Sequence, residues 1–136
     1  MEKFPHSENA LVVRTDFSDA AAWESLCQAI IKPVGDFQAN VEFLSTEEFD
    51  GLTPEQCPAM VPPHWNHVFV FLADATTLSH PEHPILCVEL SETPARAFRV
   101  IPSEMWSVEN NLSLANMDWS DFADSVAADG IFRGFS

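Results

Sequence analysis

The 136-residue chain carries six basic and twenty-one acidic residues, which give a formal net charge of -15 spread over both halves. A field of this sign repels phosphate backbones and anionic lipids, so neither nucleic acid nor a membrane is an expected partner. With 46% hydrophobic residues, a chain of this length can form one core without a metal or disulfide. We expect a flexible segment over 1–9 and a single α/β domain over 10–136.

The three cysteines indicate the compartment. Cys27, Cys57 and Cys87 form no C-x-x-C pair and lie in or beside apolar runs, where cysteine behaves as a small hydrophobe. The N-terminal stretch MEKFPHSENA lacks the apolar core of a signal peptide, and no run of about 18 apolar residues follows. A cytoplasmic location is expected, because a reducing compartment suits unpaired thiols.

The first elements in chain order are a strand and a helix. Residues 10–14 (ALVVR) form a β-branched apolar run that ends at Thr15 and Asp16, which is typical of a buried strand. We expect Ser18 to cap the following helix and Lys32-Pro33 to end it. The apolar stripe of this helix consists of Trp23, Leu26, Cys27 and Ile30.

Four further segments carry strand signals: 38–44, 67–73, 85–90 and 97–101. The run HVFVFLA over 67–73 is continuously apolar, which favours a central strand covered on both faces. Thr53 before Pro54 is typical of a short helix start, and Pro62-Pro63 must end that helix. Residues 76–84 (TTLSHPEHP) are expected to form a proline-punctuated loop.

Two helices are expected near the C-terminus. Ser103 is predicted to cap the first, and Asn110-Asn111 favour a break in its middle. Asp118 is predicted to cap the second, Gly130 to close it, and 131–135 (IFRGF) to add an edge strand. The order β-α-β-(α)-β-β-β-α-α-β predicts an α/β (or α+β) fold with a mixed sheet and helices packed on its faces.

Several site classes are disfavoured by what the chain lacks. Its four glycines, at 35, 51, 130 and 134, cannot form a phosphate-binding glycine loop, and G-x-S-x-G is absent. The pairs His64-x-x-His67 and His80-x-x-His83 have a spacing that can serve a metal. We interpret these histidines as turn residues and strand ends, and we predict no metal or other cofactor.

Charged residues within apolar strands are the main candidates for chemistry. Burying any of them alone is costly, so we expect them to pair with one another or to open onto a pocket. These residues are Arg14, Glu42, Glu89 and Arg99. Asp16 and Asp74 directly follow two apolar strands, and parallel strands would gather both carboxylates at the carboxyl edge of the sheet.

Two interpretations of these charges are open. In a catalytic pocket, Asp16, Glu89 and Glu109 are the candidate acids and bases. The candidate ligand-binding residues are Arg14, Asp74 and Arg99. The other interpretation, which we favour, is a structural network of ion pairs and helix caps.

The segment MWSVENNLSLANM contains a third set of candidates. Trp106, Asn110 and Asn111 are candidate contacts for a ligand or partner, because so many amides weaken a helix and something must offset that loss. Capping of buried backbone at a helix break explains the same amides equally well.

The linear pattern also resembles a known family. The resemblance rests on ALVVRTDFSD-x-AAWE, VGDF-x-A-x-VEF, FDGLT, NH-x-F-x-F, TL-x-HPEHP, FRVIP, MW-x-VENNLS-x-ANMD and DG-x-FRGF. These motifs run from Ala10 to Phe135 and are similar to an uncharacterised family of small microbial proteins, a domain of unknown function. The resemblance implies a single-domain protein and brings no catalytic residues. Phe49 stands where the pattern favours tyrosine, and the chain has no tyrosine for phenol-based acid chemistry.

Two functions are consistent with these observations. The first is a non-enzymatic acidic binding or accessory protein, an immunity-like or regulatory partner that docks through the segment 106–116. The second is a cofactor-independent isomerase, cyclase or hydrolase that uses carboxylates as acid and base and arginine to hold an anionic small molecule. A pocket in which Asp16, Glu89, Arg99 and Glu109 converge would favour the enzyme.

Overall fold

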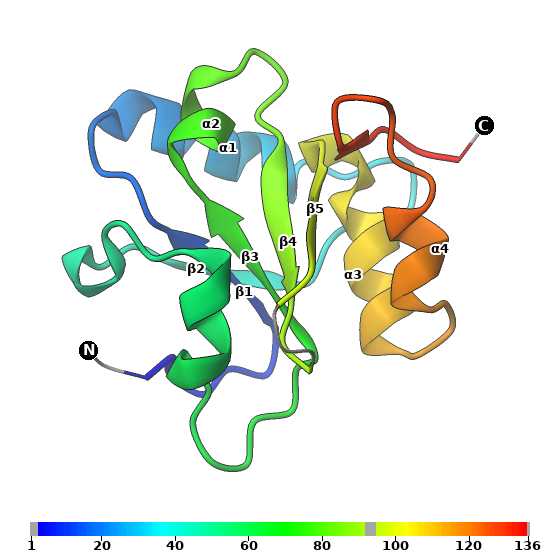
Figure 1. Ribbon diagram of the computed structural model, residues 1–136. Coiled ribbons are helices and arrows are strands. Elements are labelled where there is room, and N and C mark those ends of the chain that lie inside the picture. Colours follow the sequence, from blue (N-terminus) through cyan, green and yellow to red (C-terminus); the bar gives the residue numbers. More distant parts are fainter. Residues whose placement is uncertain (1–2, 92–94, 136) are drawn as a thin grey trace.

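A computed structural model describes residues 3–91 and 95–135 and contains one six-stranded mixed sheet (Figure 1). The strand order is β2-β1-β3-β4-β5-β6. The strands are β1 (Ala10–Arg14), β2 (Val41–Leu44), β3 (Phe69–Ala73), β4 (Ile85–Glu89), β5 (Ala97–Val100) and β6 (Ile131–Phe132). β1 is parallel to β2 and β3, β4 is antiparallel to β3 and β5, and β6 is parallel to β5. The predicted mixed α/β fold is confirmed.

The α-helices are α1 (Ala20–Ile31), α2 (Ala75–Ser79), α3 (Met105–Ser113) and α4 (Trp119–Ala123). Shorter 3-10 segments span Glu47–Phe49, Pro54–Met60 and Pro102–Glu104. The predicted cap of α1 is wrong by one residue. Asp19 is the N-cap and accepts the Ala22 amide at 2.9 Å, because the Ser18 hydroxyl donates instead to Asp16 at 2.9 Å. No helix of the described residues is long and apolar enough to cross a membrane.

Hydrophobic clusters cover both faces of the sheet. Helices α1, α3 and α4 pack on one face, where Val12, Phe71 and Phe122 are buried. The other face carries the 3-10 segments Glu47–Phe49 and Pro54–Met60, with Val13, Val70 and Cys57 in its cluster. Figure 1 accordingly shows α3 and α4 on one side of the sheet and the segment Pro54–Met60 on the other. All five residues of β3 are buried, which confirms the prediction of a central strand.

Residues 3–9 were expected to belong to a flexible segment. Within them, Phe4 is buried in the second hydrophobic cluster, and its ring lies 5.4 Å from that of Phe49. The Phe4 amide donates to the Met60 carbonyl at 2.8 Å. These contacts attach the start of the chain to the Pro54–Met60 segment.

Two predictions are corrected, one for the linker before β4 and one for helix α3. The stretch 76–84 is not only a loop, because Asp74 caps the short helix α2 and accepts the Thr77 amide at 3.0 Å. α3 does not break at Asn110-Asn111 and ends after Ser113. Beyond it, Ala115 adopts φ 56°, and the Asn116 amide donates to the Asn111 carbonyl at 2.9 Å. This is a Schellman-type ending with alanine at a position that glycine usually occupies.

Candidate functional site

The carboxyl edge of β1 and β3 gathers two of the predicted carboxylates. The strands are parallel, and Arg14 lies beside Ala73 in the register, so Asp16 and Asp74 follow at the same edge. Both line a hollow of about 400 Å³, the carboxyl-edge hollow, together with Asp50 and Thr53. The expected gathering of the two carboxylates is therefore present, and open α/β sheets commonly bind ligands at such an edge.

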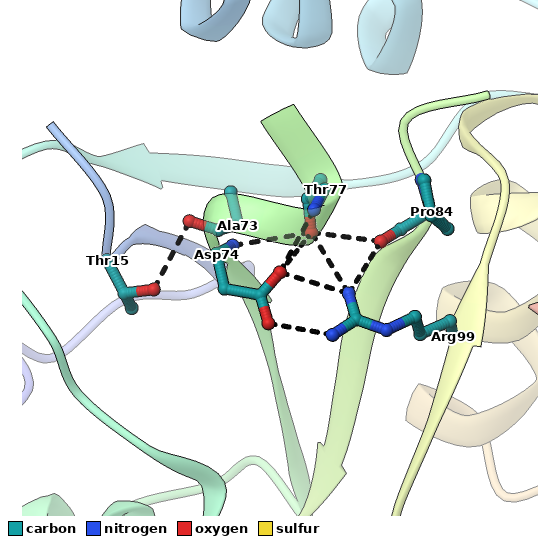
Figure 2. A network of polar contacts seen from close by, with 6 residues as sticks. All are labelled: Thr15, Ala73, Asp74, Thr77, Pro84 and Arg99. Atoms are coloured by element: carbon teal, nitrogen blue, oxygen red, sulfur yellow. Dashed lines mark hydrogen bonds and ion pairs between the residues drawn. The ribbon is translucent and has the colours of Figure 1, made fainter. Parts of the chain in front are cut away.

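Asp74 and Arg99 form a two-pronged ion pair (Figure 2). Arg99 Nη1 donates to Asp74 Oδ1 at 3.0 Å, and Nη2 donates to Oδ2 at 2.8 Å. Nη1 also donates to the Pro84 carbonyl at 3.1 Å. The Thr77 hydroxyl lies 3.0 Å from Asp74 Oδ1 and 2.9 Å from the same carbonyl, so it completes the network. The pair joins the end of β3 to β5.

The charge state of Asp74 follows from this network. Burial raises the pKa of the carboxyl, but hydrogen bonds from Arg99 and Thr77 and the charge of Arg99 outweigh burial and leave the pKa below its ordinary value. Asp74 is thus held as a carboxylate and caps α2. Because both terminal nitrogens of the Arg99 guanidinium already donate to Asp74, Arg99 is poorly placed to hold an anionic ligand.

Arg14 was expected to pair with another strand charge or to open onto a pocket. Arg14 is only 8% exposed, yet its hydrogen-bond partners are neutral groups. Nε donates to the Asp16 carbonyl at 3.0 Å, and Nη1 donates to the Ser45 hydroxyl at 3.4 Å. The guanidinium lies 4.4 Å from the Phe17 ring centroid, a cation–π contact. Within the described ranges no carboxylate forms an ion pair with Arg14, so the first of the two expected arrangements does not occur for this residue.

Glu89 and Glu42 lie away from the carboxyl-edge hollow. Glu89 is opposite Phe69, at the end where β3 begins, and its Oε1 lies 2.7 Å from Arg96 Nη2. Glu42 is exposed and accepts a hydrogen bond from the Ser7 hydroxyl. The convergence of Asp16, Glu89, Arg99 and Glu109 that would have favoured an enzyme does not occur, since antiparallel β4 carries Glu89 to the opposite edge of the sheet.

Glu109 is a buried carboxylate, 4% exposed, that is satisfied by neutral donors. It accepts the Asn40 amide at 2.6 Å, Asn110 Nδ2 at 2.9 Å and the Ser113 hydroxyl at 2.8 Å. Asn111 Nδ2 donates to the Ser107 carbonyl at 2.8 Å. Both amides of the predicted segment therefore bond to the protein itself, and Glu109 fixes α3 to the chain before β2.

Trp106 belongs to an exposed aromatic feature that the sequence reasoning missed. The Phe37 ring stacks on it, with centroids 4.3 Å apart and planes 15° apart. Phe37 is 51% exposed, and Ile31 and Val34 beside it are 40% and 39% exposed. We call Ile31, Val34, Phe37 and Trp106 the Phe37 patch. The signal that was available is the stretch VGDF, a turn with an apolar residue at each end.

The turn that carries the patch is well defined. Val34 and Phe37 exchange two backbone hydrogen bonds of 2.9 and 3.0 Å, and Gly35 between them adopts φ 61°. Trp106 Nε1 is buried without a hydrogen-bond partner in the part of the chain that the structure describes. A buried N–H group without a hydrogen-bond partner lowers the stability of the fold. Such local losses of stability are often found at surfaces that serve binding.

The fold and these sites define a mixed α/β fold whose strand charges, in the described residues, bond to other groups of the chain. Residues 9–135 match the family described as Domain of unknown function (DUF6924). The chain belongs to this family, which confirms the resemblance found in its motifs. No curated protein matches the chain.

Proposed function

We propose that this protein is an acidic, cytoplasmic binding protein that docks a basic partner protein through the Phe37 patch, in an immunity-like or regulatory role. The observation that carries the proposal is the half-exposed Phe37 ring, stacked on Trp106, with exposed Val34 paired to Phe37 across the turn and exposed Ile31 six residues earlier in the chain. Aromatic residues in a rigid setting are typical anchors of protein interfaces, since they bury a large area at low entropy cost.

The net charge supports a partner of opposite sign. At -15, two copies of this chain repel each other, which disfavours a symmetric dimer through the patch. A partner with a basic rim around an apolar centre would be attracted at long range and would bury the Phe37 ring on contact. The affinity of such a complex falls as salt screens the attraction.

The alternative function, a cofactor-independent enzyme, receives less support from the geometry. Arg99 already binds Asp74, and Glu89 and Glu109 lie in separate places with partners of their own. Asp16 lines the carboxyl-edge hollow, but no arginine is among the described residues that line it, and the neighbouring Arg14 donates to the Asp16 carbonyl and to Ser45.

The proposal is tested by photo-crosslinking in the source cells. Benzoylphenylalanine replaces Phe37, and the matched control carries it at Phe135, which is 54% exposed but lies outside the patch. We expect one reproducible protein adduct from position 37 that position 135 does not give. Equal adducts from the two positions would contradict the proposal.

The captured partner is then purified and titrated by calorimetry. Phe37→Ser is expected to weaken binding by about tenfold or more, as for an interface anchor, while Phe135→Ser leaves it unchanged. Binding should weaken between about 50 and 300 mM salt because the attraction is electrostatic. Unchanged affinity of Phe37→Ser would show that the patch is not the interface.

A further inference from the structure

A separate cavity of about 350 Å³ lies at the opposite edge of the sheet, where β1 and β3 begin. We call it the amino-edge cavity. It is bounded by the residues before these strands and by the end of α3, including Glu8, Asn66, His67, Leu112, Ser113 and Ala115. Its volume falls within the range of small-molecule sites, at the lower end. Its described lining includes none of the four strand charges and no residue of the Phe37 patch.

Three polar side chains of this cavity, those of Glu8, His67 and Ser113, offer hydrogen-bond acceptors, and Asn66 adds an amide that can donate as well as accept. The Ser113 hydroxyl donates its hydrogen to Glu109 at 2.8 Å, so only its lone pairs remain for a ligand. His67 Nε2 lies 2.7 Å from the Ser7 carbonyl oxygen, which can only accept. When the imidazole is in its neutral form, it therefore carries its hydrogen on Nε2 and keeps Nδ1 as an acceptor. Glu8 adds an exposed carboxylate at the rim, with no hydrogen bond from any residue of 3–91 or 95–135.

The charge of the residues that line the amino-edge cavity determines which ligands the cavity can hold. No lysine or arginine occurs among the described residues that line the cavity, while Glu8 lines it and Glu109 lies directly behind Ser113. An anion would be repelled there, and a donor-rich cation would satisfy the acceptors. Phe69 and Leu112 supply an apolar surface for a carbon skeleton.

We propose that the amino-edge cavity binds a small organic ammonium ion, with Glu8, His67 and Ser113 accepting its hydrogen bonds. A metal ion fits less well, because the described residues contain no group of three His, Cys, Asp or Glu side chains placed to hold one. This inference does not depend on the proposed partner protein, since it uses a different surface and a different ligand.

Ala115 adds a second feature to the same wall. It lines the cavity in the left-handed conformation, φ 56°, which costs free energy for a residue with a Cβ atom. Glycine would relieve that strain but would remove the methyl group from the wall. Strain at a cavity wall is often found where a residue shapes a binding site.

The test titrates the whole protein with n-butylammonium and follows backbone amide chemical shifts by NMR. We expect saturable shifts at residues 66–69 and 112–115, and weaker binding of neutral 1-butanol and anionic butyrate. Glu8→Gln should weaken n-butylammonium binding by about tenfold, the loss of a charge-assisted hydrogen bond. Glu24→Gln on α1 is the matched control and should bind like the wild type.

The ammonium group can come from a free amine or from a lysine side chain, and a second probe separates these sources. Nα-acetyl-lysine N-methylamide binding at least tenfold more tightly than n-butylammonium would identify a peptide lysine. Equal or weaker binding would identify a free amine. The inference is overturned if 1-butanol binds as tightly as n-butylammonium, if the shifts map outside the cavity, or if Glu8→Gln binds unchanged.

Discussion

Replacing Asp74 by asparagine removes the charge opposite Arg99 while keeping a side chain that can cap α2, because asparagine and aspartate are similar N-caps. The two side chains are 29% and 22% exposed. Broken buried pairs cost about 3–5 kcal/mol, whereas exposed pairs contribute about 0–1 kcal/mol. This partly buried pair lies between the two limits, and Asp74→Asn is expected to lower the free energy of unfolding by about 2 kcal/mol.

The pH dependence of this loss has a definite sign. The pKa of Asp74 is lowered in the folded protein, so the pair contributes its full stability above the ordinary aspartate pKa. That contribution disappears as the pH falls through the lower folded-state pKa. The difference between wild type and Asp74→Asn should be constant from about pH 8 to pH 5 and shrink below about pH 4.

The assay is urea unfolding across this pH range, with a double-mutant cycle that adds Arg99→Met. Glu82→Gln is the control, because Glu82 also pairs with an arginine, Arg133, but at a more exposed site. Its effect should be smaller than that of Asp74→Asn. A loss below about 0.5 kcal/mol for Asp74→Asn, or no coupling to Arg99, would refute the reasoning.

Three further outcomes are expected. Glu109→Gln should lower the free energy of unfolding by about 2 kcal/mol, because its amide nitrogen would face a donor; unchanged stability would contradict the buried network. Ala115→Gly should raise the melting temperature by about 3 °C in calorimetry, since glycine adopts this φ without strain, and a fall would count against the strain. Burial raises the pKa of Cys27 to about 11 and that of Cys57 to about 12, and it also raises the pKa of Cys87. Iodoacetamide at pH 8 should therefore label the native protein far more slowly than the unfolded chain, and a rapidly labelled native thiol would disprove this.

The strands at the centre of the sheet could be predicted because their sequences are apolar throughout. The runs 10–14 and 67–73 become β1 and β3, both buried on two faces. The same reasoning placed Asp16 and Asp74 at one edge, since it needed only that the two strands be parallel. Local sequence patterns were sufficient to predict which strands are buried and which residues lie at the ends of those strands.

The ion pairs could not be predicted from local patterns. Asp74 meets Arg99 across 25 residues because β4 and β5 are antiparallel and bring Arg99 beside Leu86. The same antiparallel arrangement carries Glu89 to the other edge of the sheet. The short helix α2 was missed because its five residues precede two prolines, and its stability comes largely from the Asp74 cap.

The role of Glu109 depends on an even longer-range contact, with the Asn40 amide 69 residues away. Its three neutral donors come from α3 itself and from the chain before β2. A buried glutamate in a helix looks the same in sequence whether it is catalytic or structural. Phe37 was given no role from the sequence, because the exposure of an aromatic ring depends on which distant parts of the chain pack over it.

Glu109 also connects the two proposed binding surfaces. It holds the Asn40 amide, three residues after Phe37, and it orients the Ser113 hydroxyl in the amino-edge cavity. Glu109→Gln should therefore weaken both partner binding and n-butylammonium binding in variant protein that remains folded. Phe37→Ser should affect only the first, and Glu8→Gln only the second. If Glu109→Gln changed neither, α3 would be held in place by its apolar face alone, and the carboxylate would have no part in shaping the two sites.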